Sequence, residues 1–435
     1  MRFILGELWL WVSGALIYAG LIGGSTLVLA LGVLVLSTGG LARLWARVSL
    51  EEVEYRRELP ETRAFLGERI DFTVHLSNGK FIPVPWLEVR DLLPQATPLV
   101  GGQTRRAGMP RLDAFTRQTS LRHHERLRWP MQLQTTVRGY FRLGPARLRS
   151  GDLFGFFERT RDFEQQDAVV VYPRTFALPD LGFDSARPFG EQRGGNRIFE
   201  DPLRVIGVRD YTPGDPLKRV DWKATARTGR LQSRLYEPSR TQSAVVALNI
   251  STMEQTWEGF DPVLLERGVS VAASIARTLF EHGDAVGLVT NGSFPDADRP
   301  LRLGANRRPE QLRHMLELLA MISPYTAARL SDELESRDDP LPAGATIIVV
   351  ATLMPHDLVA TLLRLRGAGH AVHVVKTSGV AWAHPLGAIP VTDVSPRMQA
   401  LEAELGVPVT TATPTPAGRG GAAGVLGAAR GGTPR

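Results

Sequence analysis

The segment that organises this 435-residue chain is residues 207–238, GVRDYTPGDPLKRVDWKATARTGRLQSRLYEP. Within it, Thr-Pro-Gly-Asp at 212–215 predicts a turn, because proline presets its φ angle and glycine accepts positive φ. Residues 224–227 predict one helical turn, which Gly229 ends with a left-handed cap. Apolar and polar residues alternate over 231–236 and predict a strand. Charged and turn residues are too dense here for a buried element, so we expect a fixed surface structure.

Three aspartates of this segment lie among seven basic residues, which predicts local ion pairs. Two interpretations follow. In the first, these pairs only fasten one domain to the next. In the second, the segment is a docking surface for a partner protein, with a tryptophan and arginines at its centre. The residues that we assign to that surface or its immediate support are Arg209, Asp215, Arg219, Asp221, Trp222, Lys223 and Arg227.

The same segment resembles the signature of the bacterial family called domain of unknown function 58. The residues that carry the resemblance are Gly207, Arg209, Tyr211, Pro213, Gly214, Asp215, Arg219, Asp221, Trp222, Lys223, Ala226, Arg227 and Leu231. Three further stretches resemble the family's middle region: Arg138-Gly139-Tyr140, Asp152-Leu153-Phe154-Gly155 and Tyr172-Pro173. The resemblance implies a membrane-anchored protein with an α/β von Willebrand factor A-like (Rossmann-like) domain. It also implies a MoxR-type AAA+ ATPase as partner.

At the N-terminus, residues 8–41 contain no charged side chain. As one helix they would measure about 51 Å, whereas a bilayer core is about 30 Å thick and needs about 20 residues. We therefore expect a hairpin of two transmembrane helices within residues 1–47, with the reversal near residues 20–25. A cleaved signal peptide is the alternative, but the apolar stretch is too long for one and has no clear cleavage site.

Arginines flank this hairpin on both sides, at position 2 before it and at positions 43, 47, 56 and 57 after it. The positive-inside rule then places both ends in the cytoplasm. We expect a multi-pass protein of the cell (inner or plasma) membrane whose bulk is cytoplasmic.

From residue 51 to residue 175 the pattern is that of a β-sandwich-like domain. Strands are predicted at 69–76, 86–89, 127–136, 141–148 and 168–171, with a hairpin-type turn at Asn78-Gly79. Residues 101–150 hold eleven arginines against Asp113 and Glu125. This excess favours either a cationic face near anionic lipid or solvated strand faces and loops.

Residues 176–203 show little periodicity and, with Gly190, Gly194 and Gly195, predict a flexible connector to the signature segment, 204–242. From 243 to 409, buried strands alternate with helices, which predicts a mostly parallel sheet covered on both faces. The strands are expected at 244–250, 285–290, 346–351 and 371–375, and the helices at 264–280, 309–322, 357–366 and 396–405. Residues 410–435, mostly Thr, Pro, Ala, Gly and Arg, predict a disordered tail.

The resemblance to von Willebrand A-like domains raises the question of a Mg²⁺ site at the end of the first strand of that sheet. Hard cations prefer carboxylate oxygens, but the corresponding positions here are Asn249, Ser251 and Met253, with Thr352 after a later strand. An amide and a thioether are poor Mg²⁺ ligands. The sequence therefore predicts a degenerate site, no bound metal and no other cofactor.

The remaining composition limits the function. The formal net charge is +6, and the chain has no cysteine, which excludes disulfides and thiolate chemistry. Nucleotide-binding, hydrolase and zinc-protease motifs are absent, and nothing resembles a nucleic-acid-binding motif. We therefore expect a non-enzymatic, membrane-anchored adaptor or scaffold that contacts lipid and a protein partner but no nucleic acid. The alternatives are a divergent divalent-metal-binding module or hydrolase, and a structural protein of the cell envelope.

Overall fold

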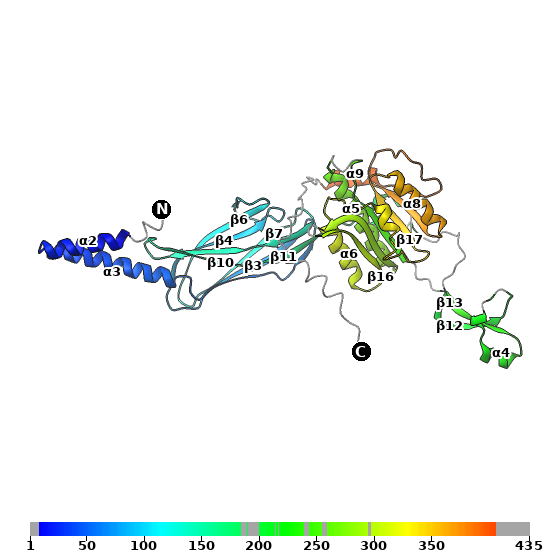
Figure 1. Ribbon diagram of the computed structural model, residues 1–435, viewed down its shortest axis with the longest axis horizontal. Helices are drawn as coiled ribbons and strands as arrows, with labels where there is room; N and C mark the ends of the chain where they lie inside the picture. The colour runs from blue at the N-terminus through cyan, green and yellow to red at the C-terminus, as the bar shows by residue number, and fades with distance from the viewer. Residues whose placement is uncertain are drawn as a thin grey trace. The chain divides into compact units, whose positions relative to one another are not determined.

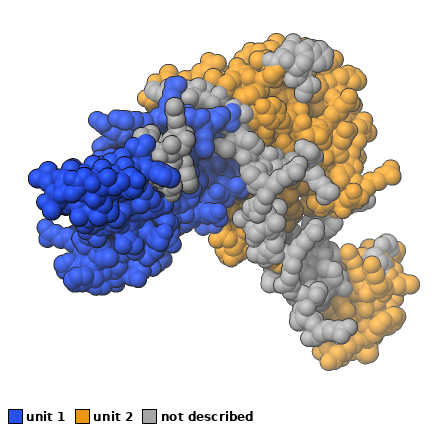
Figure 2. All heavy atoms as spheres, turned by 60° about the vertical axis from the view of Figure 1, so that its left-hand side comes forward, with its two compact units in different colours: residues 1–174, 319–322, 410–435 blue, residues 175–318, 323–409 orange. Residues whose placement is uncertain are grey.

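The computed structural model describes residues 8–183, 189, 200–213, 215, 217–238, 243–254, 259–294 and 297–405. They form two compact units (Figure 2), one made chiefly of residues 1–174 and the other of residues 175–318 and 323–409. The expected tail at 410–435 and glycines 190, 194 and 195 lie outside the described residues.

The first unit begins with two helices that run antiparallel, α2 (Leu8–Ile22) and α3 (Thr26–Val48) (Figure 1). The chain reverses at Gly23 and Gly24, inside the predicted range, and Gly24 has φ 61°. By length and composition, α3 is the one described helix able to cross a membrane, while α2 has 15 described residues. One candidate span is thus present in the structure where the sequence predicted two.

The two helices pack closely because each has glycines that lie directly against the other helix. A Cβ on Gly20 would lie 2.6 Å from the backbone of Leu29, and one on Gly39 would lie 2.3 Å from the ring of Trp9. Most large apolar side chains of both helices point outward and are exposed. Such a surface is typical of helices that face lipid rather than water.

Eleven strands follow and form a β-rich domain. Three sheets share one hydrophobic core, to which Phe72, Leu87, Leu133 and Leu148 contribute fully buried side chains. The first sheet has the order β1-β3-β7, the second β10-β9-β4-β6-β5 and the third β2-β11-β8. Their bounds are β1 Val53–Glu58, β2 Arg63–Phe65, β3 Arg69–Asn78, β4 Val84–Pro94, β5 Thr104–Arg106, β6 Leu112–Leu121, β7 Arg126–Gln134, β8 Gly139–Leu143, β9 Ala146–Gly151, β10 Glu158–Phe163 and β11 Asp167–Tyr172.

Two local predictions in this domain are wrong. Asn78-Gly79 is not a hairpin turn, because β3 pairs with β1 and β7 whereas β4 belongs to another sheet. Its buried amide donates instead to the carbonyls of Ile82 and Arg122, and so fixes a crossing between sheets. The single strand predicted at 141–148 is two strands, β8 and β9. The chain turns between them at Gly144 (φ 94°), where a Cβ would lie 2.5 Å from the carbonyl oxygen of Gln165.

The described residues of the predicted connector include a short helix. Residues 178–181 form a short 3₁₀ helix, η1 (Leu178–Leu181), which packs on helices α5 (Pro262–Glu281) and α9 (Ser395–Glu404). Leu178, Leu181 and Phe183 are buried. Strand β12 (Glu200–Asp210) begins inside the range assigned to the connector. The sequence did not indicate η1, because these few apolar residues dock on distant helices and have no periodicity of their own.

The second unit contains the predicted α/β sheet. Its order is β16-β15-β14-β17-β18-β19, with five parallel strands and an antiparallel edge strand, β16. The strands are β14 Ser243–Asn249, β15 Ala285–Phe294, β16 Ala297–Asn306, β17 Thr346–Ala351, β18 Ala371–Lys376 and β19 Val391–Asp393. The remaining helices are α6 Glu310–Met321, α7 Leu330–Leu334 and α8 His356–Gly367.

Helices cover both faces of this sheet (Figure 1). Alternate residues of a strand point to opposite faces. Val245 and Ile347 accordingly pack with Leu330 of α7 and Leu358 of α8. Helix α5, buried along most of its length, contacts β14, β15 and β17. The arrangement leaves the carboxyl ends of the parallel strands at one edge, the usual ligand-binding position in open α/β sheets.

Candidate functional site

The signature segment forms a small module of its own, a β-hairpin with a helix at its tip. Strand β12 pairs antiparallel with β13 (Gln232–Pro238), so that Arg209 faces Ser233 and Asp210 faces Gln232. The connection between the strands contains a 3₁₀ turn, η2 (Leu217–Arg219), and the helix α4 (Trp222–Thr228). We call residues 200–238 the hairpin–helix module.

One aspartate holds the turn of the module. The Asp215 carboxylate accepts hydrogen bonds from Arg209 Nη2 at 2.7 Å and from the backbone N–H of Thr212 at 3.1 Å. The Asp215 carbonyl also accepts from the Tyr211 hydroxyl. The Arg209 hydrogen bond, followed by the Thr212 N–H, lowers the pKa of Asp215. The predicted turn is present, since the N–H of Asp215 donates to the Thr212 carbonyl.

A second aspartate begins the helix. Asp221 Oδ1 accepts from the backbone N–H of Ala224 at 3.0 Å, the geometry of an N-cap. Its Oδ2 accepts from Arg234 Nε on β13 at 3.2 Å. The Ala224 N–H and then Arg234 lower the pKa of Asp221. Gly229 ends the helix with φ 67°, as the sequence predicted.

The module leaves its central aromatic side chain in solvent. Trp222, the first residue of α4, is 67% exposed, and Leu217 in η2 is 69% exposed. Leu231, at the other end of α4, is also exposed. Lys223 and Arg227 lie on the exposed surface of the same helix, of which only Ala224 is buried.

The seven residues predicted for the docking surface therefore divide into two groups. Arg209, Asp215 and Asp221 are engaged in contacts inside the module, and Arg219 adds positive charge near Asp215. The outward-facing members are Trp222, Lys223 and Arg227. Sequence reasoning did not assign Leu217 and Leu231 to the docking surface; Leu231 begins the predicted strand 231–236. For Leu217 the available signal was an apolar residue among turn and charged residues that belonged to no predicted element.

Asn249 and Ser251, two of the residues predicted for a degenerate metal site, lie at the carboxyl end of β14 and form a hydrogen-bonded network with Asn291 of β15. Asn249 Oδ1 accepts from Asn291 Nδ2 at 3.0 Å and from the Ser251 N–H at 3.1 Å. Asn249 Nδ2 donates to the Leu353 carbonyl at 3.1 Å. Asn291 also donates to the Ser251 hydroxyl and accepts from the Ile250 N–H. The sequence analysis did not include Asn291, because its place beside Asn249 depends on the pairing of two distant strands.

The other two residues of that predicted site lie apart from this network. The Thr352 hydroxyl pairs with that of Thr377 at 3.0 Å, and Met253 is exposed. Within the described ranges, no group of three or more histidine, cysteine, aspartate or glutamate side chains has the spacing of a metal site. The side-chain oxygens and nitrogens of Asn249 and Asn291 each have a hydrogen-bond partner within the protein.

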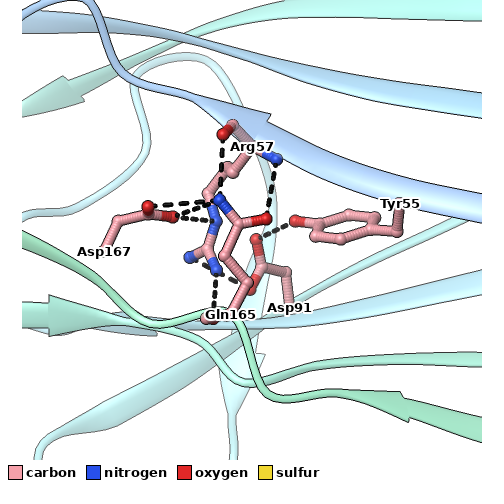
Figure 3. Close-up of polar contacts among 5 residues, drawn as sticks. All are labelled: Tyr55, Arg57, Asp91, Gln165 and Asp167. Carbon is pink, nitrogen blue, oxygen red and sulfur yellow. Dashed lines mark hydrogen bonds and ion pairs between the residues drawn. The ribbon is translucent and has the colours of Figure 1, made fainter.

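A third polar cluster lies inside the β-rich domain and was not predicted (Figure 3). Arg57, on β1, contacts Asp91 at 3.5 Å and Asp167 at 3.2 Å and donates to the Gln165 carbonyl at 3.0 Å. The Tyr55 hydroxyl donates to Asp91 Oδ2 at 2.6 Å. The pKa of Asp91 is raised, because burial outweighs the opposing effects of Arg57 and Tyr55.

This cluster is closed to substrates, since Arg57 and Asp91 are almost completely buried. Burial, followed by the Asp91 charge, also raises the pKa of Tyr55, so the phenol stays a neutral donor. Through these contacts Arg57 connects β1 with β4 and with the beginning of β11. We interpret the cluster as an internal fastening of the β-rich domain rather than as a catalytic centre.

Comparisons with known proteins agree with the signature. Residues 207–394 match the family described as "Protein of unknown function DUF58". An uncharacterized protein YeaD of Bacillus subtilis (strain 168) is 26% identical over 278 residues, which cover 63% of this chain and 64% of that protein. The match thus spans less than two thirds of the relative's length.

Solved structures resemble parts of the chain only weakly. The CARDB domain of the PF1109 protein from Pyrococcus furiosus has a TM-score of 0.18 and 16% identity, covering 28% of this chain and 94% of that one. Spo0M, a sporulation control protein from Bacillus subtilis, has a TM-score of 0.17 and 12% identity, covering 28% and 49%. Likenesses this low carry no argument about fold or function. The family match over residues 207–394 covers the module from Gly207 onward and the α/β sheet through its last strand, β19.

Proposed function

We propose that this protein is a membrane-anchored, non-enzymatic adaptor that binds a partner protein through the hairpin–helix module. The observation that carries the proposal is the exposure of Trp222 on a module whose own ion pairs hold it in shape. Burying a large apolar side chain instead of leaving it in water stabilises a protein or a complex by about 1.5–3 kcal/mol. A structure that fixes such a side chain outward is suited to binding another surface.

The charges around Trp222 indicate the chemistry of the partner. Lys223 and Arg227 lie on the same short helix. Tryptophan and arginine are the residue types that most often dominate binding energies at protein interfaces. Cations at the rim accelerate encounter with an acidic surface. We therefore infer a partner with an apolar pocket bordered by carboxylates.

The identity of the partner and the kind of α/β domain follow from the family resemblance. We propose that the sheet of the second unit is a von Willebrand factor A-like domain and that the partner is a MoxR-type AAA+ ATPase. The adaptor would then serve maturation of a protein complex or a process of the cell envelope. The amide network around Asn249 supports a binding rather than a metal-dependent role, because its acceptor and donor atoms already have protein partners.

Anchoring in the membrane is the second part of the proposal. Helix α3 supplies one span, and we propose that α2 crosses the membrane as well, so that both ends of the hairpin lie in the cytoplasm. A reporter enzyme that works only outside the cytoplasm, fused after Arg435, is expected to be inactive. Activity of that fusion would place the bulk of the chain outside and favour a structural role in the envelope.

Crosslinking in native membranes tests the docking proposal. A photoreactive residue replaces Ala226, which is exposed on α4 and has no polar side-chain contact to lose. Capture of a MoxR-type AAA+ ATPase is the expected result. Capture of this chain's own β-rich domain alone would mean that the module fastens one domain to another.

A further inference from the structure

The loop between β9 and β10, residues 152–157, is held rigidly by its first residue. The buried Asp152 accepts from the backbone N–H of Phe154 at 2.8 Å and from that of Phe157 at 2.6 Å. Its carbonyl accepts from the Trp86 indole at 2.9 Å. We call this segment the Asp152 loop. Its conformation is fixed by hydrogen bonds that do not involve its apolar side chains.

Those apolar side chains point away from the protein core. Leu153, Phe154 and Phe156 are 61%, 63% and 66% exposed, and the two phenylalanine rings stack with their centroids 5.7 Å apart. Three large exposed apolar residues within four positions are an unusual patch for a surface that meets water. A rigid loop that presents them without covering them is suited to an apolar environment.

That environment is indicated by the neighbouring helix. A hydrophobic pocket of about 370 Å³ lies between α3 and the Asp152 loop. Its walls include Leu41, Trp45, Leu153 and Phe154. Nearby, Trp9 of α2 meets Phe157 edge to face at 6.1 Å. The patch on the loop is thus continuous with the exposed apolar surface of the helix that is long and apolar enough to cross a membrane.

The carboxylate and the hydroxyls in the pocket wall already have protein partners: the Asp152 carboxylate accepts from the loop N–H groups, and the two hydroxyls are also used. Ser37 and Thr38 both line the pocket, but their hydroxyls donate to the carbonyls of Val33 and Leu34 in the same helix. The wall therefore offers no hydroxyl donor to a polar ligand. The indole N–H of Trp45 is buried and has no acceptor among the described residues.

We propose that the Asp152 loop enters the membrane interface beside α3, and that a phospholipid acyl chain occupies the pocket between them. This proposal rests on the membrane anchoring by α3 proposed above and adds a second attachment, which fixes the β-rich domain at the bilayer surface. A protein partner fits less well, because it would have to reach a pocket that lies along the membrane-facing helix. Insertion of Leu153, Phe154 and Phe156 buries the apolar patch without changing the loop.

The absence of cysteine allows a direct depth measurement. The full-length Phe154→Cys variant is labelled with a polarity-sensitive fluorophore and reconstituted in vesicles of phosphatidylcholine and phosphatidylglycerol. Quenching is measured with nitroxide on the lipid acyl chain, with nitroxide on the headgroup, and with iodide in the buffer. Leu34→Cys on the exposed side of α3 and Glu61→Cys, past the end of β1 away from α3, are the matched controls.

The proposal predicts that acyl-chain nitroxide quenches the label at 154 several-fold more than the label at 61, and more than headgroup nitroxide does. Iodide should quench it several-fold less. A label at 154 that behaves like the label at 61, while the label at 34 is quenched by lipid, overturns this inference and leaves the anchoring by α3 intact. A label at 34 without lipid quenching overturns both. Shielding of position 154 from lipid and iodide alike would mean that protein covers the loop, and would also reject the proposal.

Discussion

The carboxylate of Asp221 accepts a hydrogen bond from the backbone N–H of Ala224, and this contact starts the helix that presents Trp222 to solvent. The acidic residue of the signature therefore acts inside the module, and the neighbouring tryptophan is its outward-facing group. The division between residues that hold the module and residues that face outward is the basis of the adaptor proposal.

Removing the cap should loosen the helix. With Asp221→Ala, the first backbone N–H groups of α4 lose their acceptor and Arg234 loses its partner. Amide hydrogen exchange in α4 should accelerate, whereas Asp221→Asn should retain most of the protection because asparagine is also a good N-cap. Because the pKa of Asp221 lies below its ordinary value of 3.8, its stabilisation is present above that value and lost as pH falls through the lowered pKa. Equal exchange in the wild type and both variants would show that Asp221 does not hold α4.

The buried arginine of the β-rich domain should be essential for its stability. Arg57→Met leaves the buried Asp91 without its cation and also removes the partner of the partly exposed Asp167, and we expect a loss of about 3–5 kcal/mol in the free energy of unfolding. Chemical denaturation of the full chain measures it. Arg56→Met, one residue away on the exposed side of β1, is the control and should change stability by about 0.5 kcal/mol or less. Similar effects of the two substitutions would contradict the role assigned to the cluster.

The amide network at the sheet edge should reject a carboxylate. Asn249→Asp removes the donor to the Leu353 carbonyl and buries a charge, for an expected loss of about 1–3 kcal/mol without metal. The control is Asn306→Asp. The side-chain oxygen of Asn306 accepts hydrogen bonds from the N–H groups of Arg307 and Arg308, and an aspartate oxygen can accept the same bonds, so the free energy of unfolding should not change. Mg²⁺ should not raise the melting temperature of the wild type. A clear rise would favour the metal-binding alternative.

One histidine should give the second unit a pH dependence. Burial lowers the pKa of His373 from 6.5 to about 4, while its ring nitrogen pairs with the Thr392 hydroxyl at 2.9 Å. The unfolded chain binds a proton at this residue below pH 6.5, but the folded chain does so only near pH 4. The free energy of unfolding should therefore decrease as the pH is lowered from 6.5 to 4. His373→Gln should flatten that part of the pH–stability curve. An unchanged curve for His373→Gln would mean that this histidine does not titrate as expected.

Local patterns were enough for much of the α/β sheet. The apolar run 346–351 became β17 with the predicted bounds, because a strand buried on both faces has a strong pattern of its own. The pattern of 264–280 likewise gave α5. Strand β16 was missed, since Pro300 and Gly304 interrupt it and its position at the sheet edge imposes no continuous apolar pattern.

The parts that sequence reasoning missed depend on contacts between distant residues. Nothing near Asp91 in the sequence indicates that it lies against Tyr55 and Arg57, because the contact requires β1 and β4 to belong to sheets that share one core. In the same way, the signature predicted a charged surface segment but did not show which charges are used internally. In the folded hairpin, the side chain of Asp221 makes contacts inside the module, whereas the side chain of the adjacent Trp222 faces solvent.

The central claim is tested most directly by the effect of Trp222→Ala on crosslinking from position 226 to the partner in native membranes. Because only an exposed side chain is removed, the free energy of unfolding should hold within about 0.5 kcal/mol. The yield of the crosslinked ATPase should fall at least tenfold, which corresponds to about 1.4 kcal/mol of binding free energy. Tyr325→Ala, which removes another exposed aromatic side chain of the second unit, should leave the yield unchanged. An undiminished yield with Trp222→Ala, or unfolding of that variant, would contradict the assignment of Trp222 as the docking residue.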